Sequence, residues 1–129
     1  MTSLRSKPTN AELEILRVLW ARGASTVRQV NEILSVDREI GYTTTLKLMQ
    51  IMAEKGLVSR DETDRTHVYV ARATQGHTQR QLVSDLMDRA FGGSAAALVM
   101  QALSAQPASS DEIEEIRKLI NEHRKAGRR

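Results

Sequence analysis

The chain of 129 residues contains no cysteine, which excludes disulfides and metal sites built on thiolates. Aromatic residues make up only 3% of it, so its core must be mostly aliphatic, as in a small helical domain. No apolar run approaches the roughly 18 residues that a membrane-spanning helix needs. The N-terminal residues also lack the apolar centre of a signal peptide. We therefore expect a cytoplasmic protein with no membrane insertion.

Groups that carry catalysis or bind metal are also scarce. The three histidines, His67, His77 and His123, are scattered, and no Ser/His/Asp arrangement or phosphate-cradling glycine loop is apparent. We therefore expect no enzyme activity, no catalytic residue, no metal site and no cofactor. The net charge of +3 and the pI of about 9.6 are compatible with a polyanionic partner, but many proteins are as basic.

The first part of the chain predicts three helices followed by a β-hairpin. A capping box over residues 9–12 begins the first helix, and Ser25 or Thr26 begins the second. The third helix begins at about Tyr42 and ends at Gly56, a left-handed C-cap. Apolar residues on both sides of the polar tip at 61–64 indicate the two strands of a wing. The expected fold is mostly α with a small β-hairpin: a winged helix-turn-helix in residues 1–73.

The third helix has two unlike faces. Apolar residues and Thr45 share one face, whereas hydroxyl, amide and lysine side chains lie on or beside the other, which suits the major groove of DNA. The candidate DNA-binding residues are Tyr42, Thr43, Thr44, Lys47 and Gln50 on this helix, Arg28 at the start of the second helix, and Arg60 and Arg65 in the wing. The alternatives are that the hydroxyls only cap the helix, that Arg28 and Lys47 are merely solvated, and that Arg65 pairs with an aspartate of the tip.

Residues 74–129 predict three more helices with apolar stripes. Three short helices cannot easily bury their own apolar stripes. A second copy of the chain is the simplest partner that would cover them. We expect a helical dimerisation region whose interface includes Leu82, Leu86, Leu98, Leu103, Ile113, Ile116 and Ile120.

Several of these segments, in this order and spacing, resemble the penicillinase-repressor (BlaI/MecI/CopY) family of bacterial regulators. They are residues 14–20, residues 26–30, Tyr42 to Thr44 with Gln50, residues 54–58, Arg65 and Tyr69 of the wing, and residues 91–94. The resemblance implies a homodimeric repressor of transcription that binds double-stranded, pseudo-palindromic operator DNA, often with TACA/TGTA-like half-sites. It also implies relief of repression when a membrane sensor protease causes cleavage of the dimerisation region. Copper-responsive members use cysteines, which this chain lacks.

The chain departs from the family pattern at three places. Family members commonly carry a smaller hydroxyl residue at the position of Lys47, and some carry arginine at that of Ile51. Residues 99–103 lack the Asn-Phe pair that is cut in the resistance repressors. The exact operator and the cleavage site therefore stay open. Two other functions remain as alternatives. One is a winged helix that binds protein; the other is a DNA-binding activator, which differs from a repressor in where the operator lies relative to the promoter.

Overall fold

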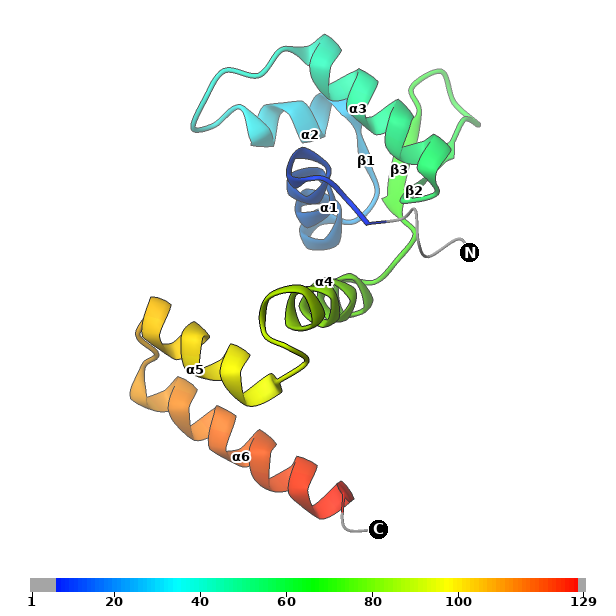
Figure 1. Cartoon of the computed structure of the whole chain (residues 1–129). Helices are drawn as coiled ribbons and strands as arrows, with labels where there is room; N and C mark the ends of the chain where they lie inside the picture. Colours follow the sequence, from blue (N-terminus) through cyan, green and yellow to red (C-terminus); the bar gives the residue numbers. More distant parts are fainter. Residues whose placement is uncertain (1–6, 128–129) are drawn as a thin grey trace. The chain divides into compact units, whose positions relative to one another are not determined.

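The computed structural model describes residues 7–127 and consists of six helices and three short strands within that range. The elements are α1 (Asn10–Arg22), β1 (Ser25–Thr26), α2 (Val27–Leu34), α3 (Tyr42–Lys55), β2 (Val58–Asp61), β3 (Val68–Ala71), α4 (Gln75–Ala90), α5 (Ala95–Ala105) and α6 (Ser110–Gly127), labelled in Figure 1. The expected mostly helical fold with a winged helix-turn-helix is confirmed. Residues 1–6 and 128–129 of the two expected domains lie outside the described range.

The chain divides into two compact units, Met1–Val83 and Ser84–Arg129. The first unit extends into α4, whereas the sequence placed a domain boundary between residues 73 and 74. The start of α4 lies close to the first unit. The indole nitrogen of Trp20 donates a hydrogen bond of 3.0 Å to the carbonyl of Ala73, and Thr78 in α4 is only 3% exposed. The assignment of separate functions to the two parts remains a prediction.

The core of the first unit is aliphatic apart from Tyr69, and α1, α2, α3 and the sheet all contribute to it. Its buried apolar residues are Ile15, Leu16, Val18, Leu19, Val27, Val30, Met49, Met52, Leu57, Val58 and Tyr69. The 3.6-residue spacing of the apolar residues in the helices explains this arrangement, because each helix turns one stripe inward. Ile33 of α2, although apolar, is 37% exposed.

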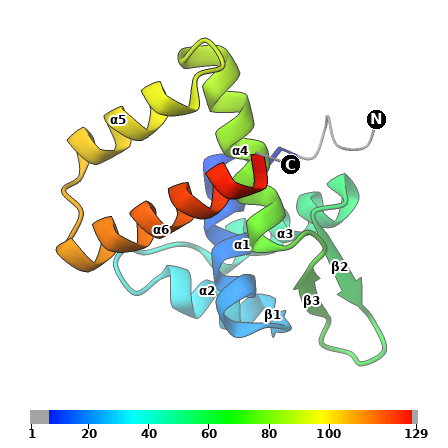
Figure 2. The ribbon, with the colours of Figure 1, turned by 90° about the horizontal axis from the view of Figure 1, so that it is seen from below.

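The sheet has three strands in the order β1-β3-β2, all antiparallel, where the sequence predicted only a hairpin. The additional strand β1 has two residues and pairs Ser25 with Tyr69. A two-residue strand has no alternating pattern, so nothing local in the sequence could reveal it. The loop between β2 and β3 extends beyond the strands and forms the tip of the wing (Figures 1 and 2).

Helix boundaries follow the predicted chemistry closely. Thr9 and Glu12 form a reciprocal capping box at α1, and Thr26 with Gln29 forms a second one at α2. Gly56 ends α3 with φ 84° and ψ 13°, a left-handed conformation that glycine adopts without steric cost. These caps fix where each helix of the winged helix begins or ends.

The second unit leaves its apolar side chains open in the single chain. Gly92 and Gly93, both with positive φ, follow α4, and the Ser94 hydroxyl accepts a hydrogen bond from the amide of Ala97 at the start of α5. Neither α5 nor α6 contains a buried residue among the described ones. The apolar stripes of these helices therefore stay at least partly exposed in the described chain.

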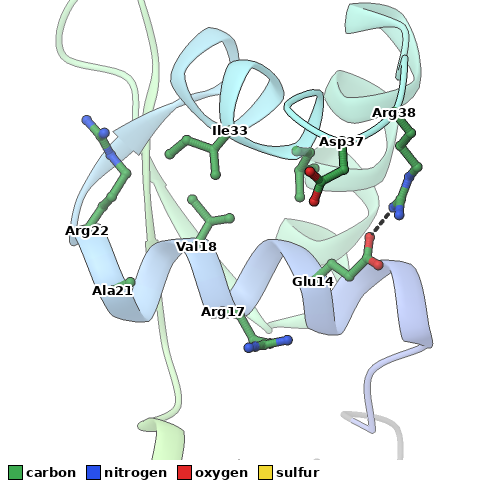
Figure 3. Close-up of a pocket in the computed structure, with 9 residues that line it drawn as sticks. Glu14, Arg17, Val18, Ala21, Arg22, Ile33, Asp37 and Arg38 are labelled. Atoms are coloured by element: carbon green, nitrogen blue, oxygen red, sulfur yellow. Dashed lines mark hydrogen bonds and ion pairs between the residues drawn. The ribbon is translucent and has the colours of Figure 1, made fainter.

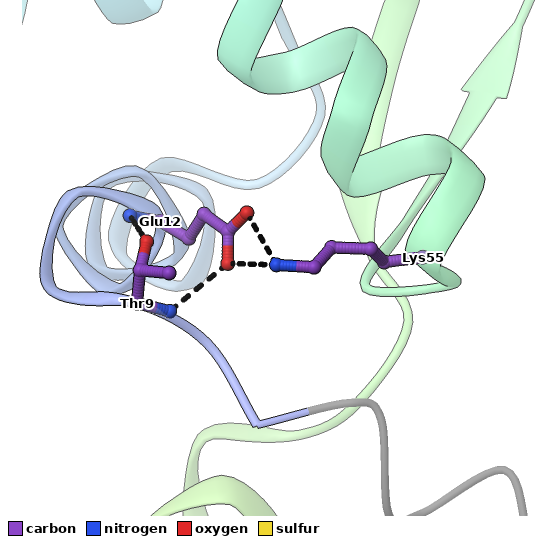
Figure 4. Close-up of polar contacts among 3 residues, drawn as sticks. All are labelled: Thr9, Glu12 and Lys55. Carbon is purple, nitrogen blue, oxygen red and sulfur yellow. Dashed lines mark hydrogen bonds and ion pairs between the residues drawn. The ribbon is translucent and has the colours of Figure 1, made fainter.

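A buried carboxylate links α1 to the C-terminal end of α3 (Figure 4). Glu12 is 2% exposed, and its Oε1 accepts a hydrogen bond of 2.9 Å from the backbone N–H of Thr9. The Nζ of Lys55 lies 2.8 Å from both carboxylate oxygens. Since a buried charge is costly unless it is paired, this contact holds the last turn of α3 against the first turn of α1.

Replacing Lys55 with methionine should lower the free energy of unfolding by about 1–3 kcal/mol, because Glu12 then keeps a buried and under-satisfied carboxylate. Urea unfolding at one fixed protein concentration measures this change. Lys118→Met is the matched control, since Lys118 and Glu115 are both exposed and 4.0 Å apart. The control should change stability by less than about 0.5 kcal/mol. Equal effects of the two substitutions would contradict the proposed role of the Glu12 contact.

Candidate nucleic-acid interface

The orientation of α3 is fixed by its buried face. Thr45, Met49 and Met52 are each 0% exposed. The side-chain amide of Asn31 in α2 donates hydrogen bonds of 2.9 Å to the carbonyl of Ile40 and to the Thr45 hydroxyl. One side chain of α2 therefore holds both the residue that leads into α3 and the first turn of α3 itself. The opposite face of α3 is consequently turned to solvent.

Every side chain predicted to contact DNA is exposed. On α3 these are Tyr42, Thr43, Thr44, Lys47 and Gln50; elsewhere they are Arg28, Arg60 and Arg65. The N-cap of α3 is Gly41, and it makes no side-chain capping hydrogen bond. The alternative in which Thr43 or Thr44 caps this helix is therefore wrong. Among residues 7–127 the structure records no hydrogen bond of either hydroxyl, so both are available to a ligand.

The predicted residues come together from three parts of the first unit. Arg28 of α2, Tyr42 and Gln50 of α3, and Arg60 and Arg65 of the wing line one hollow of about 310 Å³. Thr43, Thr44 and Lys47 do not line it and lie on the exposed face of α3. The remaining lining residues are Thr26, Val27, Leu46, Thr66, His67 and Tyr69, none of which we predicted as site residues. A basic hollow beside a polar helix face suits a sugar-phosphate backbone that runs past the helix.

Three of the predicted cations carry no partner in the described part of the chain. The structure records no ion pair or side-chain hydrogen bond there for Arg28, Lys47 or Arg65. The alternative pairing of Arg65 with an aspartate of the wing tip is thus not found. Asp61 instead accepts hydrogen bonds from the hydroxyl of Thr63 at 2.6 Å and from its amide at 2.9 Å. These bonds hold the pKa of Asp61 below its usual value, the hydroxyl contributing most.

Arg60 differs from the other cations because it is already engaged. Its Nε lies 2.6 Å from a carboxylate oxygen of Glu62. The pKa of Arg60 lies above its usual value, chiefly because of a hydrogen bond to the Tyr69 hydroxyl. Desolvation lowers this pKa, and the nearby Glu62 carboxylate raises it. Arg60 therefore stays charged, but a phosphate must compete with Glu62 for it. Of the two wing arginines predicted to contact DNA, Arg60 is therefore the less available.

A second hollow, of about 360 Å³, lies between α1, α2 and the loop that leads to α3. Figure 3 shows Val18 and Ile33 pointing toward one another there, while Arg17 points away. Arg38 of the loop forms an ion pair with Glu14 of α1 at its edge. None of the predicted DNA-binding residues lines this hollow.

The described residues hold no cluster of three histidine, cysteine, aspartate or glutamate side chains that could bind a metal ion. Within residues 7–127, no helix is both long enough and apolar enough to cross a membrane.

A family model described as the penicillinase repressor matches residues 8–122. The transcriptional regulator BlaI of Mycobacterium tuberculosis is 39% identical over 77 residues, which cover 59% of this chain but only 53% of that protein. The match thus spans about half the length of that relative.

Two further relatives match over nearly their whole length. The methicillin resistance regulatory protein MecI of Mammaliicoccus sciuri is 20% identical over 113 residues, with 88% of this chain and 92% of that protein covered. The penicillinase repressor of Bacillus licheniformis is 22% identical over 116 residues, covering 90% and 91%. RosR of H. salinarum shares the fold, with a TM-score of 0.51, 20% identity and coverage of 92% and 96%. By the family match over most of its length, the chain belongs to the penicillinase repressor family of transcriptional repressors, which are not enzymes.

Proposed function

We propose that the chain is a homodimeric repressor that binds a pseudo-palindromic DNA operator, with α3 in the major groove and α2 and the wing on the flanking backbone. The observation that carries this proposal is the convergence of Arg28, Tyr42, Gln50, Arg60 and Arg65 on one hollow beside the polar face of α3. A helix lies against base edges only if its flanks meet the phosphates on either side. Here both flanks carry arginines.

The polar character of α3 separates this proposal from a winged helix that binds protein. A protein-binding helix of that kind would present an apolar outward face. The exposed face of α3 instead presents Thr43, Thr44, Lys47 and Gln50. A threonine methyl packs on the thymine methyl group, and a glutamine amide pairs with adenine, so these side chains favour base reading. Whether binding represses or activates depends on where the operator lies, and the family assignment favours repression.

Dimerisation is supported by the uncovered apolar positions of the second half. Of the predicted interface residues, Leu86 is 46% exposed, Leu103 38%, Ile113 37% and Ile120 52%, while Leu82, Leu98 and Ile116 are half-buried. Contact with a second copy would remove this apolar surface from water at roughly 25 cal/mol per Å². Joining two DNA-reading units also makes the second half-site contact intramolecular, which raises affinity by about 10²–10⁴-fold.

Loss of the dimer would then release the repressor from its operator. Residues 94–109 contain α5 and its mostly exposed flanks, and α5 has no buried residue that a cut would disrupt. A cut there by a sensor-dependent protease would separate the two DNA-reading units without unfolding either one. Because this chain lacks the Asn-Phe pair in residues 99–103, such a protease must recognise a different sequence.

DNA binding should weaken steeply with salt. If Arg28, Lys47 and Arg65 each neutralise one phosphate in both subunits, six phosphates are contacted. The slope of log K against log salt is then about −5. Titration of a duplex from the region upstream of the chain's own gene at several salt concentrations measures it. A slope near zero on a duplex that is bound specifically would contradict the electrostatic part of the proposal.

Thr44→Val should weaken operator binding by about 1–3 kcal/mol for each base that the hydroxyl reads, with little change in melting temperature. The substitution keeps the shape of the side chain and removes a hydroxyl that makes no recorded hydrogen bond in the described structure. Binding is measured by fluorescence anisotropy and stability by thermal melting. Operator binding as tight as that of the wild type would contradict a base-reading role of the Thr44 hydroxyl.

A chain shortened to end at Val83 retains the whole first compact unit. It should be folded and monomeric, and it should bind the operator at least about a hundredfold more weakly than the full chain at the same salt. Sedimentation, circular dichroism and a footprint of both forms on one duplex test this. Binding as tight as that of the full chain would contradict a role for dimerisation in affinity.

A further inference from the structure

His67 lies inside the basic hollow, although it was not among the residues predicted to contact DNA. Its side chain lines the hollow together with Arg28, Arg60 and Arg65. It is exposed, and within residues 7–127 the structure records no hydrogen bond or ion pair of its imidazole. The group is therefore available to a ligand that enters between α2, α3 and the wing.

The backbone at His67 is held in place rather than free. The next residue, Val68, is the first of β3 and pairs with Asp61 of β2 on one side and with Thr26 of β1 on the other. Thr26 is also the N-cap of α2 and lines the same hollow. His67 thus sits at the root of the wing, where little backbone entropy is lost when its side chain binds.

The charges around His67 are mainly positive. Arg28 comes from α2, and Arg60 and Arg65 come from the wing, while Tyr42 of α3 and Tyr69 of β3 add phenol groups. The acidic groups of the wing are Asp61, Glu62 and Asp64; the first is bound to Thr63 and the second to Arg60. A phosphate that enters the hollow therefore meets mostly positive charge.

We propose that His67 is a DNA contact that binds a backbone phosphate in its protonated form, so that each subunit takes up a proton when it binds DNA. An imidazole commonly titrates near pH 6.5, and its two N–H groups are both donors once protonated. The affinity of the repressor for DNA then rises as the pH falls. This inference rests on the proposed function, because it assigns a further residue to the same interface.

The test measures the dissociation constant of the full chain for one duplex between pH 5.5 and 8 at constant ionic strength. If a phosphate favours the protonated imidazole tenfold, affinity should rise up to about tenfold per half-site and about a hundredfold per dimer as the pH falls. His67→Gln should lack this rise, so that its affinity changes little between pH 5.5 and pH 8. His67→Arg should bind tightly throughout with little pH dependence. His77→Gln, outside the hollow, is the matched control and should keep the full rise.

The possible outcomes distinguish failure of the His67 proposal from failure of the proposed DNA-binding function. A wild-type affinity that does not change with pH, or a rise that persists in His67→Gln, would overturn the role of His67 while leaving DNA binding intact. Failure of the wild type to bind any duplex at any pH would overturn the proposed function itself. Nuclear magnetic resonance of the His67 imidazole is a second test, and it uses the unaltered chain. The midpoint of the His67 titration should move to higher pH when DNA is added, and an unmoved midpoint would contradict the proposal.

Discussion

The burial of one face of α3 is the constraint on which the rest of the first unit depends. Met49 and Met52 are fully buried among the aliphatic residues of α1 and α2 and the side of the sheet. Truncating a buried methionine of this kind to alanine costs about 2–5 kcal/mol, a large part of the stability of a small domain. The helix therefore cannot rotate about its axis without disrupting the core. Its polar face is held outward as a consequence, and the Asn31 amide and the Glu12–Lys55 contact secure its two ends.

Charge placement follows from that fixed helix. The net charge of +3 is too small to direct the chain to DNA by bulk excess. The fold instead gathers arginines from α2 and from the wing beside α3 and leaves Arg28 and Arg65 without an acidic partner in the described chain. Acidic residues of the wing tip are satisfied locally, Asp61 by Thr63 and Glu62 by Arg60. A weakly basic protein can thus present a locally basic surface.

Features that depend on neighbours in sequence were predictable, and features that depend on distant partners were not. The capping box at Thr9, the left-handed Gly56 and the buried face of α3 all follow from local spacing and backbone preference. Strand β1 was not predicted, because a strand of two residues shows no alternating pattern and its pairing partner, β3, is distant in the sequence. The position of His67 in the hollow was not predicted for a related reason. Only the pairing of β3 with both other strands brings His67 to the same hollow as Arg28. The burial of Thr78 in α4 likewise depends on residues far from it in the sequence.

The most direct test of the account maps DNA onto the protein surface. Amide chemical shifts of the isotopically labelled full chain are followed while a duplex is added at low salt, where backbone contacts dominate. The account predicts that the largest changes fall in residues 26–28, 42–50 and 65–67, with small changes around the hollow that Val18 and Ile33 line. Changes concentrated at Val18 and Ile33, with α3 unaffected, would contradict the claim that the exposed face of α3 and the basic hollow beside it form the DNA-binding surface.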